Sequence, residues 1–294
     1  MRKRSTGWLL LAPSLVLMVL AGLVPFVYVA WTAFHRWNLN AVTRDAVFNG
    51  LDNVRRLVHD ERVLDATRTT VLFAVYAVGS QLVIGYGLAR LLMRRFPGRQ
   101  LFRTVHTIPL LVAPIAVGAT WRILLVPGLG PLPHYLEQWF GWHVDLGTSG
   151  TVAFWSLVLV DLWHWTPFVT LSLLAGLSAL PVEPFEAARV DGAPAWRILW
   201  HITLPMLKPV LIATAFIRLM DALRLVDEAA MLTKGGPGDS TRFLGLQLVR
   251  IVFENNDYGY GGTVSLFALY VTLVISWALY TVTTGIKRQR VHGG

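Results

Sequence analysis

Long apolar stretches dominate the chain, and three of them contain no charged residue: residues 8–34, 69–89 and 258–286. The hydrocarbon core of a bilayer is about 30 Å thick and needs roughly 20 consecutive apolar residues in a helix to cross it. The first stretch follows a basic N-terminus, but secretory signals have apolar regions of only about 7 to 15 residues. All three stretches therefore predict transmembrane helices that belong to the mature protein.

Three further apolar stretches, residues 104–121, 151–179 and 204–225, contain a few polar side chains. Those side chains are His106 in the first, Asp161 and His164 in the second, and Lys208, Arg218, Asp221 and Arg224 in the third. The third is the hardest to interpret, and we count it as a span because an even number of spans then results. The expected fold is an all-α membrane protein with one transmembrane domain over residues 1–294. The predicted spans are about 8–34, 68–91, 101–126, 151–178, 204–226 and 258–286.

The composition agrees with a membrane protein, since 54% of the residues are hydrophobic and 15% are charged, against roughly 25% charged in soluble domains. Basic residues gather on one side of the predicted spans, which in membrane proteins is the cytoplasmic side. They are Arg2, Lys3 and Arg4; Arg90, Arg94, Arg95, Arg99 and Arg103; Arg189, Arg197 and Lys208; and Lys287, Arg288 and Arg290. Residues 127–150, on the opposite side, contain no lysine or arginine. Both termini are therefore expected in the cytoplasm, and the net charge of +9 does not indicate a nucleic-acid partner.

Catalytic chemistry is not indicated. The chain has no cysteine and no phosphate-binding Gly-x-x-x-x-Gly-Lys-Ser/Thr motif. His134 and His143 near Asp145 match no usual metal-ligand spacing, so we expect no metal site, no cofactor and no catalytic residue in this chain. The glycine-rich residues 235–238 and 259–262 are better explained by turns and close helix packing than by a nucleotide site.

One polar loop, residues 180–205, has a distinctive pattern. Residues 186–190 favour a helix, Asp191-Gly192 is a break signal, and residues 194–201 restart a helix. Two short helices joined at a glycine could fit a cleft in a soluble partner. Equally, Trp196 and Trp200 would suit an amphipathic segment lying at the membrane surface. The spacing alone leaves both interpretations open.

The residue types in this loop resemble the EAA loop of binding-protein-dependent ATP-binding-cassette (ABC) importer permeases. The matching pattern is Glu-Ala-Ala from Glu186, a glycine at Gly192 and Ile-x-Leu-Pro ending at Pro205. The resemblance implies the type I ABC importer permease fold and a coupling helix that docks on an ATPase subunit. The implied coupling residues are Glu186, Ala187, Ala188, Asp191, Gly192 and Ala193.

Residues 232–238, and the segment from Trp163 to Pro167, resemble the carbohydrate branch of this family, of maltose or trehalose type. The resemblance implies a permease of the bacterial inner membrane that moves a sugar-like solute into the cytoplasm by alternating access. Implied partners are a second homologous permease subunit, two ATPase subunits that bind ATP and Mg²⁺, and an extracytoplasmic solute-binding protein. Implied solute-pathway residues are His164, Trp165, Phe168, Met220, Leu223, Arg224 and Asp227. Arg224 and Asp227 depart from the neutral amides expected there, so the solute stays open between disaccharides, other oligosaccharides and glycerol phosphate.

An ion-coupled secondary transporter is the main alternative, with Asp161, Asp221 and Asp227 as coupling carboxylates. Six spans are few for that class. The spacing of Arg218, Asp221 and Arg224 also permits a purely structural role, in which neighbouring charges on one helix face neutralise each other. A membrane scaffold without transport would leave these charges without a purpose.

Overall fold

The computed structural model describes residues 2–285, so the predicted basic residues Lys287, Arg288 and Arg290 and the end of the last predicted span lie outside them. Contacts divide the chain into two compact units. The first contains residues 1–65 and 247–271, and the second contains residues 66–246 and 272–294. The long helices α3 (Glu61–Met93) and α13 (Tyr258–Gly285) contribute to both units.

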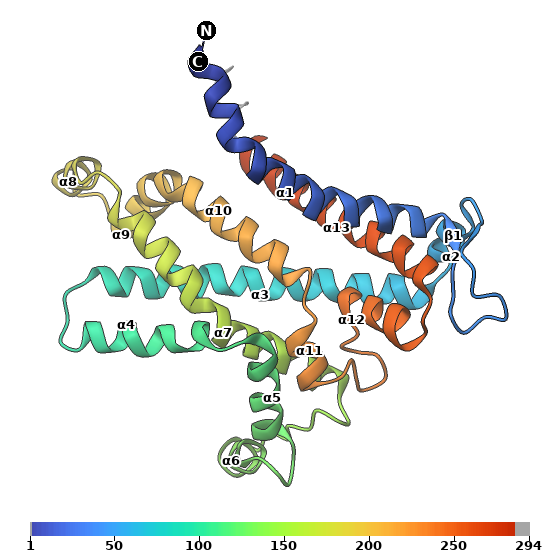
Figure 1. Ribbon diagram of the computed structural model, residues 1–294. Coiled ribbons are helices and arrows are strands. Elements are labelled where there is room, and N and C mark those ends of the chain that lie inside the picture. Colours follow the sequence, from blue (N-terminus) through green and yellow to red (C-terminus); the bar gives the residue numbers. More distant parts are fainter. Residues whose placement is uncertain (1, 286–294) are drawn as a thin grey trace. The chain divides into compact units, whose positions relative to one another are not determined.

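The first unit is built around the end of α1 (Arg2–Ala33), drawn in blue in Figure 1. After α1 come a two-stranded antiparallel sheet, in which His35 pairs with Phe48, and a short helix. These elements are β1 (His35–Arg36), β2 (Val47–Phe48) and α2 (Asp52–Val58), and the π-helical turn η3 (Arg250–Glu254) precedes α13. The sheet and the short helices were not predicted from the sequence.

Glycines at the start of α13 allow it to lie directly against α1 within this unit. A Cβ atom on Gly262 would lie 2.3 Å from Thr32 Oγ1, and one on Gly259 would lie 2.1 Å from the His35 carbonyl oxygen. Both distances are far below van der Waals contact, so a larger residue would force the backbones apart. The predicted role of residues 259–262 in close helix packing is confirmed at Gly262, which meets α1, whereas Gly259 meets the strand β1.

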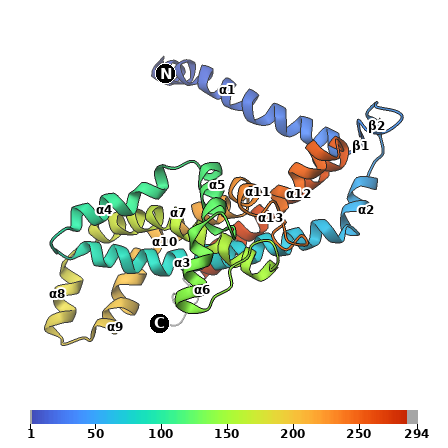
Figure 2. The same ribbon diagram turned by 90° about the horizontal axis from the view of Figure 1, so that it is seen from below.

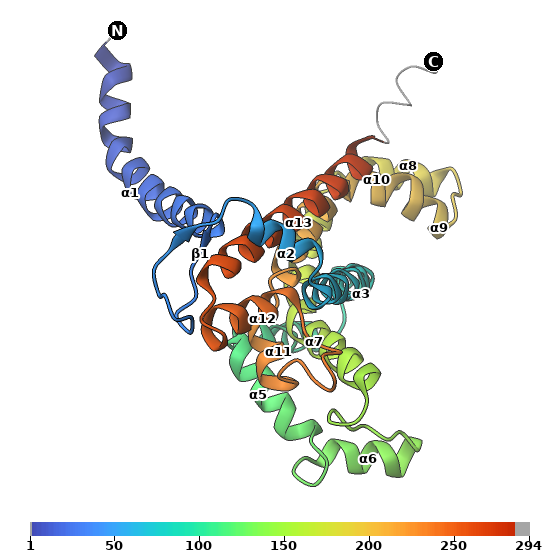
Figure 3. The same ribbon diagram turned by 90° about the vertical axis from the view of Figure 1, so that its right-hand side faces the viewer.

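The second unit contains most of the remaining helices, which Figures 1, 2 and 3 show in cyan to orange. In chain order they are α4 (Arg99–Thr107), the 3-10 turn η1 (Ile108–Leu111), α5 (Pro114–Leu125), α6 (Pro131–Phe140), α7 (Gly150–Ser178), α8 (Glu183–Val190), α9 (Ala195–Ile198), the π-helical turn η2 (Leu199–Thr203), α10 (Leu204–Ala222) and α11 (Asp227–Leu232). The short helix α12 (Leu244–Val249) begins in this unit, and its residues from Gln247 on belong to the first unit.

Helix α7 is the centre of this unit, and fourteen of its 29 residues are buried. Small residues let its neighbours approach: a Cβ on Gly85 of α3 would lie 2.7 Å from Val169 Cγ1, and one on Gly176 of α7 would lie 2.8 Å from Leu207 Cδ1 of α10. Small residues at helix crossings are the usual means of tight packing in membrane proteins. Apolar side chains from α3, α5, α7, α10 and α11 complete the core.

The third predicted span is broken rather than straight. The segment Arg99–Leu111 and the following helix Pro114–Leu125 are bent by 101°, and Figure 1 shows α5 leaving the line of α4. The cause is local: Val112 and Ala113 have extended backbones, and a proline at position 114 disfavours the helical conformation for the residue before it.

Five described helices are long and apolar enough to cross a membrane, and six spans result if the bent pair counts as one. The difficult fifth span is one of them, as part of the continuous helical segment Ala195–Ala222. It ends four residues before the predicted boundary at 226. Arg224 and Asp227 therefore lie outside α10, in the connection to α11 and at its start.

Candidate functional site

The α8–α9 loop has the predicted form of two short helices with a sharp bend between them (Figure 2). At the bend Gly192 has a φ of +69°, a left-handed conformation that favours glycine. Two backbone bonds close the turn, from Gly192 N to the Arg189 carbonyl at 3.1 Å and from Ala193 N to the Ala188 carbonyl at 2.9 Å. This pair of bonds is the Schellman motif, which satisfies carbonyls at a helix C-terminus.

The predicted coupling residues divide by exposure. Glu186, Ala187, Asp191 and Gly192 are exposed, Ala193 is half-buried and Ala188 is buried. Among the residues that the structure describes, Glu186 forms no ion pair within 4.0 Å. The bend therefore presents a carboxylate and a small apolar surface outward.

The Ile202-Thr203-Leu204-Pro205 part of the motif lies where the loop continues into α10. Residues 199–203 form the π-helical turn η2, and the Thr203 hydroxyl donates to the Ile198 carbonyl at 3.3 Å. Pro205 has no backbone N–H and so cannot donate an α-helical hydrogen bond to the turn before it. This missing bond explains the wider, π-helical turn at this place. The loop is thus joined to α10 through helical backbone.

A buried polar cluster centred on Arg218 joins α3, α7 and α10. Arg218 Nε donates to Gln81 Oε1 at 2.9 Å, Nη2 donates to Asp161 at 3.1 Å, and Nη1 pairs with Asp221. Gln81 Nε2 also donates to Asp161 Oδ2 at 2.6 Å. The side chains of Arg218 and Asp161 are each 1% exposed, whereas that of Asp221 is 43% exposed.

This cluster explains how the charges of the fifth span are accommodated. A charge inside a bilayer is costly unless it is paired, and every nitrogen of the Arg218 guanidinium has an acceptor. The predicted pairing of Arg218 with Asp221 is present, but Arg224 takes no part, because α10 ends at Ala222. Arg224 is exposed, and within the described residues it forms no ion pair.

A second buried pair holds the broken third span. His164 Nδ1 lies 2.5 Å from Glu228 Oε1, and His164 Nε2 lies 3.1 Å from the carbonyl of Val112, at the bend. Both side chains are at most 2% exposed. Helix α11, which carries Glu228, also packs on α5, where a Cβ on Gly118 would lie 2.8 Å from the Glu228 carbonyl oxygen.

The predicted solute-pathway residues occupy different environments. Trp165 is half-buried, and Cζ of the Arg218 guanidinium lies over its ring, 4.5 Å from the ring centroid. The ring of Phe168 meets that of Trp165 edge to face. Met220 is half-buried, while Arg224 and Asp227 are exposed. His164 and Leu223 belong to the packed interior. The aromatic pair is therefore brought together, but no single surface unites all seven residues.

Two polar residues of these clusters were not identified from the sequence. Gln81 is the one side-chain amide within the charge-free stretch 69–89, and an amide in an apolar span needs a polar partner, which was a usable signal. Glu228 adjoins the chosen Asp227, and nothing in the spacing separates the buried residue from the exposed one.

Comparison with known proteins gives consistent relationships. Residues 81–289 match the family described as binding-protein-dependent transport system inner membrane component. The chain is 34% identical to the trehalose/maltose transport system permease protein MalF of Thermococcus litoralis, over 98% of this chain and 96% of that one. It is 30% identical to the trehalose transport system permease protein SugA of Mycobacterium tuberculosis, over 94% and 88%.

A solved bacterial ABC transporter for import of the acidic polysaccharide alginate contains a chain of the same fold. The TM-score is 0.81 with 19% sequence identity, covering 97% of this chain and 98% of that one. The predicted type I importer permease fold is thereby confirmed. The chain belongs to the family of inner membrane components of binding-protein-dependent transport systems, and it is a multi-pass protein of the cytoplasmic membrane.

Proposed function

We propose that this chain is the membrane-spanning permease subunit of an ABC importer that moves a sugar or sugar-like solute into the cytoplasm by alternating access. The observation that carries the proposal is the α8–α9 loop, an exposed bend closed by a Schellman turn and joined by helical backbone to α10. A force applied at such a bend reaches a transmembrane helix directly.

The energy for transport would come from partner subunits. Two ATPase subunits would bind ATP and Mg²⁺ and receive the loop through Glu186, Ala187, Ala188, Asp191, Gly192 and Ala193. A second, homologous permease subunit would complete the channel, and an extracytoplasmic binding protein would deliver the solute. Permeases of this family are transport components, and this chain itself would break no bond.

A carbohydrate solute is supported by the names of the relatives, which are permeases for trehalose and maltose. The half-buried Trp165 and Phe168 agree with it, because sugar sites combine an aromatic face with directional hydrogen bonds. The exposed Arg224 and Asp227 would lie at one end of the proposed solute pathway, and Trp165 and Phe168 would line its interior.

An ion-coupled mechanism is less well supported by the same geometry. Asp161 and Asp221, two of the three carboxylates available for ion coupling, both pair with Arg218. A carboxylate held by a guanidinium is a poor site for a transported proton or sodium ion.

Reconstitution tests the proposal. The purified complex is placed in proteoliposomes with ATP inside and the binding protein outside, and uptake of labelled trehalose, maltose and glycerol 3-phosphate is measured. We expect uptake of a sugar that requires ATP and is lost with a non-hydrolysable analogue. Uptake that does not require ATP but is lost when an ionophore removes an ion gradient would instead establish ion-coupled secondary transport.

A further inference from the structure

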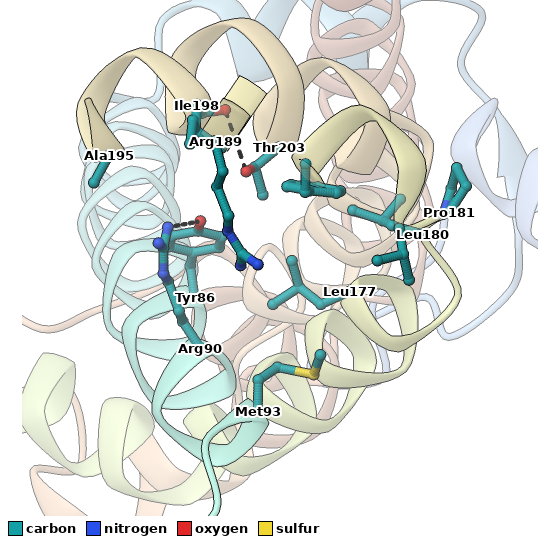
Figure 4. A pocket seen from close by; sticks show the side chains of 12 residues that line it. Tyr86, Arg90, Met93, Leu177, Leu180, Pro181, Arg189, Ala195, Ile198 and Thr203 are labelled. Carbon is teal, nitrogen blue, oxygen red and sulfur yellow. Dashed lines mark hydrogen bonds between the residues drawn. The ribbon is translucent and has the colours of Figure 1, made fainter. Parts of the chain in front are cut away.

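A pocket of about 420 Å³ lies between the last turns of α3 and α7 and the α8–α9 loop (Figure 4). Its volume falls within the range of small-molecule sites, about 300 to 1,000 Å³. Most of the lining is apolar. The lining residues used below are Met93, Leu177, Leu180, Phe185, Ala195 and Ile198.

Two guanidinium groups line this apolar pocket, one from each side. Arg90 comes from α3 and Arg189 from α8, and no carboxylate is among the lining residues. Arg90 Nη1 donates to the Tyr86 hydroxyl at 3.3 Å, a bond that leaves its charge uncompensated. Within the described residues neither arginine forms an ion pair within 4.0 Å. The pocket thus offers two positive charges beside an apolar wall.

The pocket also lies at the end of two membrane spans. Met93 is the last residue of α3 and Leu177 is in the last turn of α7, and both helices are long and apolar enough to cross a bilayer. On the same loop Trp196 and Trp200 are 59% and 64% exposed. Exposed tryptophans are typical of the membrane–water boundary, which agrees with a pocket mouth at the height of the lipid headgroups.

We propose that this pocket binds an anionic phospholipid. Its phosphate would lie between Arg90 and Arg189, and part of an acyl chain would lie along Leu177, Leu180 and Phe185. Basic pockets between membrane helices on the cytoplasmic side are known to bind anionic headgroups. A lipid fits better than a soluble anion, because a soluble anion would leave the apolar wall unused.

The position gives the lipid a consequence for the loop. Arg90 and Arg189 belong to opposite walls, so one phosphate would bridge α3 to α8. Bound lipid would then hold the loop against the transmembrane helices, and the anionic lipid content of the membrane would set how firmly it is held.

The absence of cysteine from the chain allows the pocket to be probed directly in the assembled complex. A cysteine at Ala195, in the pocket lining, is labelled with a maleimide in nanodiscs of phosphatidylcholine or of phosphatidylcholine mixed with phosphatidylglycerol. We expect phosphatidylglycerol to slow labelling of Ala195→Cys but not of a reference Gly98→Cys, which lies outside the lining.

Charge variants then test the two arginines. Arg90→Gln combined with Arg189→Gln should need about thirtyfold more phosphatidylglycerol for the same protection, since each of the two basic residues near an anionic surface contributes about one kcal/mol. Arg95→Gln, an exposed arginine outside the pocket, should protect like the unaltered protein. Equal labelling in both lipids, or equal protection in the double variant, would overturn the site.

A soluble source is tested by adding inorganic phosphate or glycerol 3-phosphate to the phosphatidylcholine nanodiscs. Protection by either anion alone would overturn the lipid assignment, and no protection supports it. Labelling needs neither solute nor ATP, so its result is independent of whether the proposed sugar transport is correct.

Discussion

The Arg218 cluster and the α8–α9 loop use charged residues in opposite ways. In the cluster every guanidinium nitrogen of Arg218 meets an acceptor from α3, α7 or α10. In the loop Glu186 and Arg189 are exposed and form no ion pair with the described residues. The difference follows from the surroundings: a buried charge must be paired within the fold, whereas an exposed one remains available to a partner.

The largest effect is expected from removing the centre of the cluster. Arg218→Leu leaves Asp161 and Gln81 buried without their partner, which costs about 3 to 5 kcal/mol for a broken buried pair. Thermal unfolding of the detergent-solubilised complex measures this loss, with the exposed Arg224→Leu as control. The double variant with Asp161→Leu should regain part of the stability. Equal unfolding temperatures for Arg218→Leu and Arg224→Leu would show that the cluster does not stabilise the fold.

The adjacent residues Asp227 and Glu228 show the same contrast between an exposed and a buried, paired charge. Glu228→Ala removes the bond to His164 and should lower stability by about 1.5 to 3 kcal/mol, as for hydrogen bonds to charged groups. Asp227→Asn should leave unfolding unchanged and instead alter the KM for solute uptake. Destabilisation by Asp227→Asn, or normal uptake in that variant, would remove Asp227 from the proposed solute route.

Within the loop, the bend at Gly192 is the most sensitive point. Gly192→Val must hold a φ of +69°, which costs roughly 1 to 2 kcal/mol for a residue with a side chain. ATP-driven uptake should fall, while Gly192→Asn should retain most of it, because asparagine tolerates this conformation. If valine and asparagine gave the same uptake, the geometry of the bend would not matter for coupling.

Glu186 should affect partner binding without affecting the fold. Glu186→Lys reverses an exposed charge, so the unfolding temperature should not move, but co-purification of the ATPase subunits and uptake should both decrease. Glu183→Lys is the matched control, since Glu183 is exposed on the same helix and lies outside the Glu-Ala-Ala match. Loss of ATPase binding in both variants alike would indicate a general charge effect.

The topology test is decided by labelling and not by stability, since Gly98→Cys must hold a φ of +79°. Gly98 lies in the connection between α3 and α4, and Gly147 lies before α7. Single cysteines at the two positions should react with an impermeant thiol reagent from opposite faces, with Gly98→Cys protected in intact cells. Reaction of both from outside would place the loop on the wrong side for an ATPase and would refute cytoplasmic termini.

Local patterns in the sequence were sufficient for several features. Apolar runs of about twenty residues predicted the spans, because crossing a bilayer depends on length and hydrophobicity within one segment. Residues 186–201 predicted two short helices with a break at Gly192. A glycine in the left-handed conformation ends a helix by hydrogen bonds among adjacent residues, so this feature depends on local sequence only. The match at Glu186, Gly192 and Pro205 also indicated the family.

The tertiary structure decided which charges meet. Arg218 is 57 residues from Asp161 and 137 from Gln81 along the chain, and no local rule links them. It also buried Glu228 and exposed Asp227, and it placed the carbonyl of Val112 beside His164, where the third span bends. These choices depend on which helix faces pack together, so the sequence specifies them only through the folded chain as a whole.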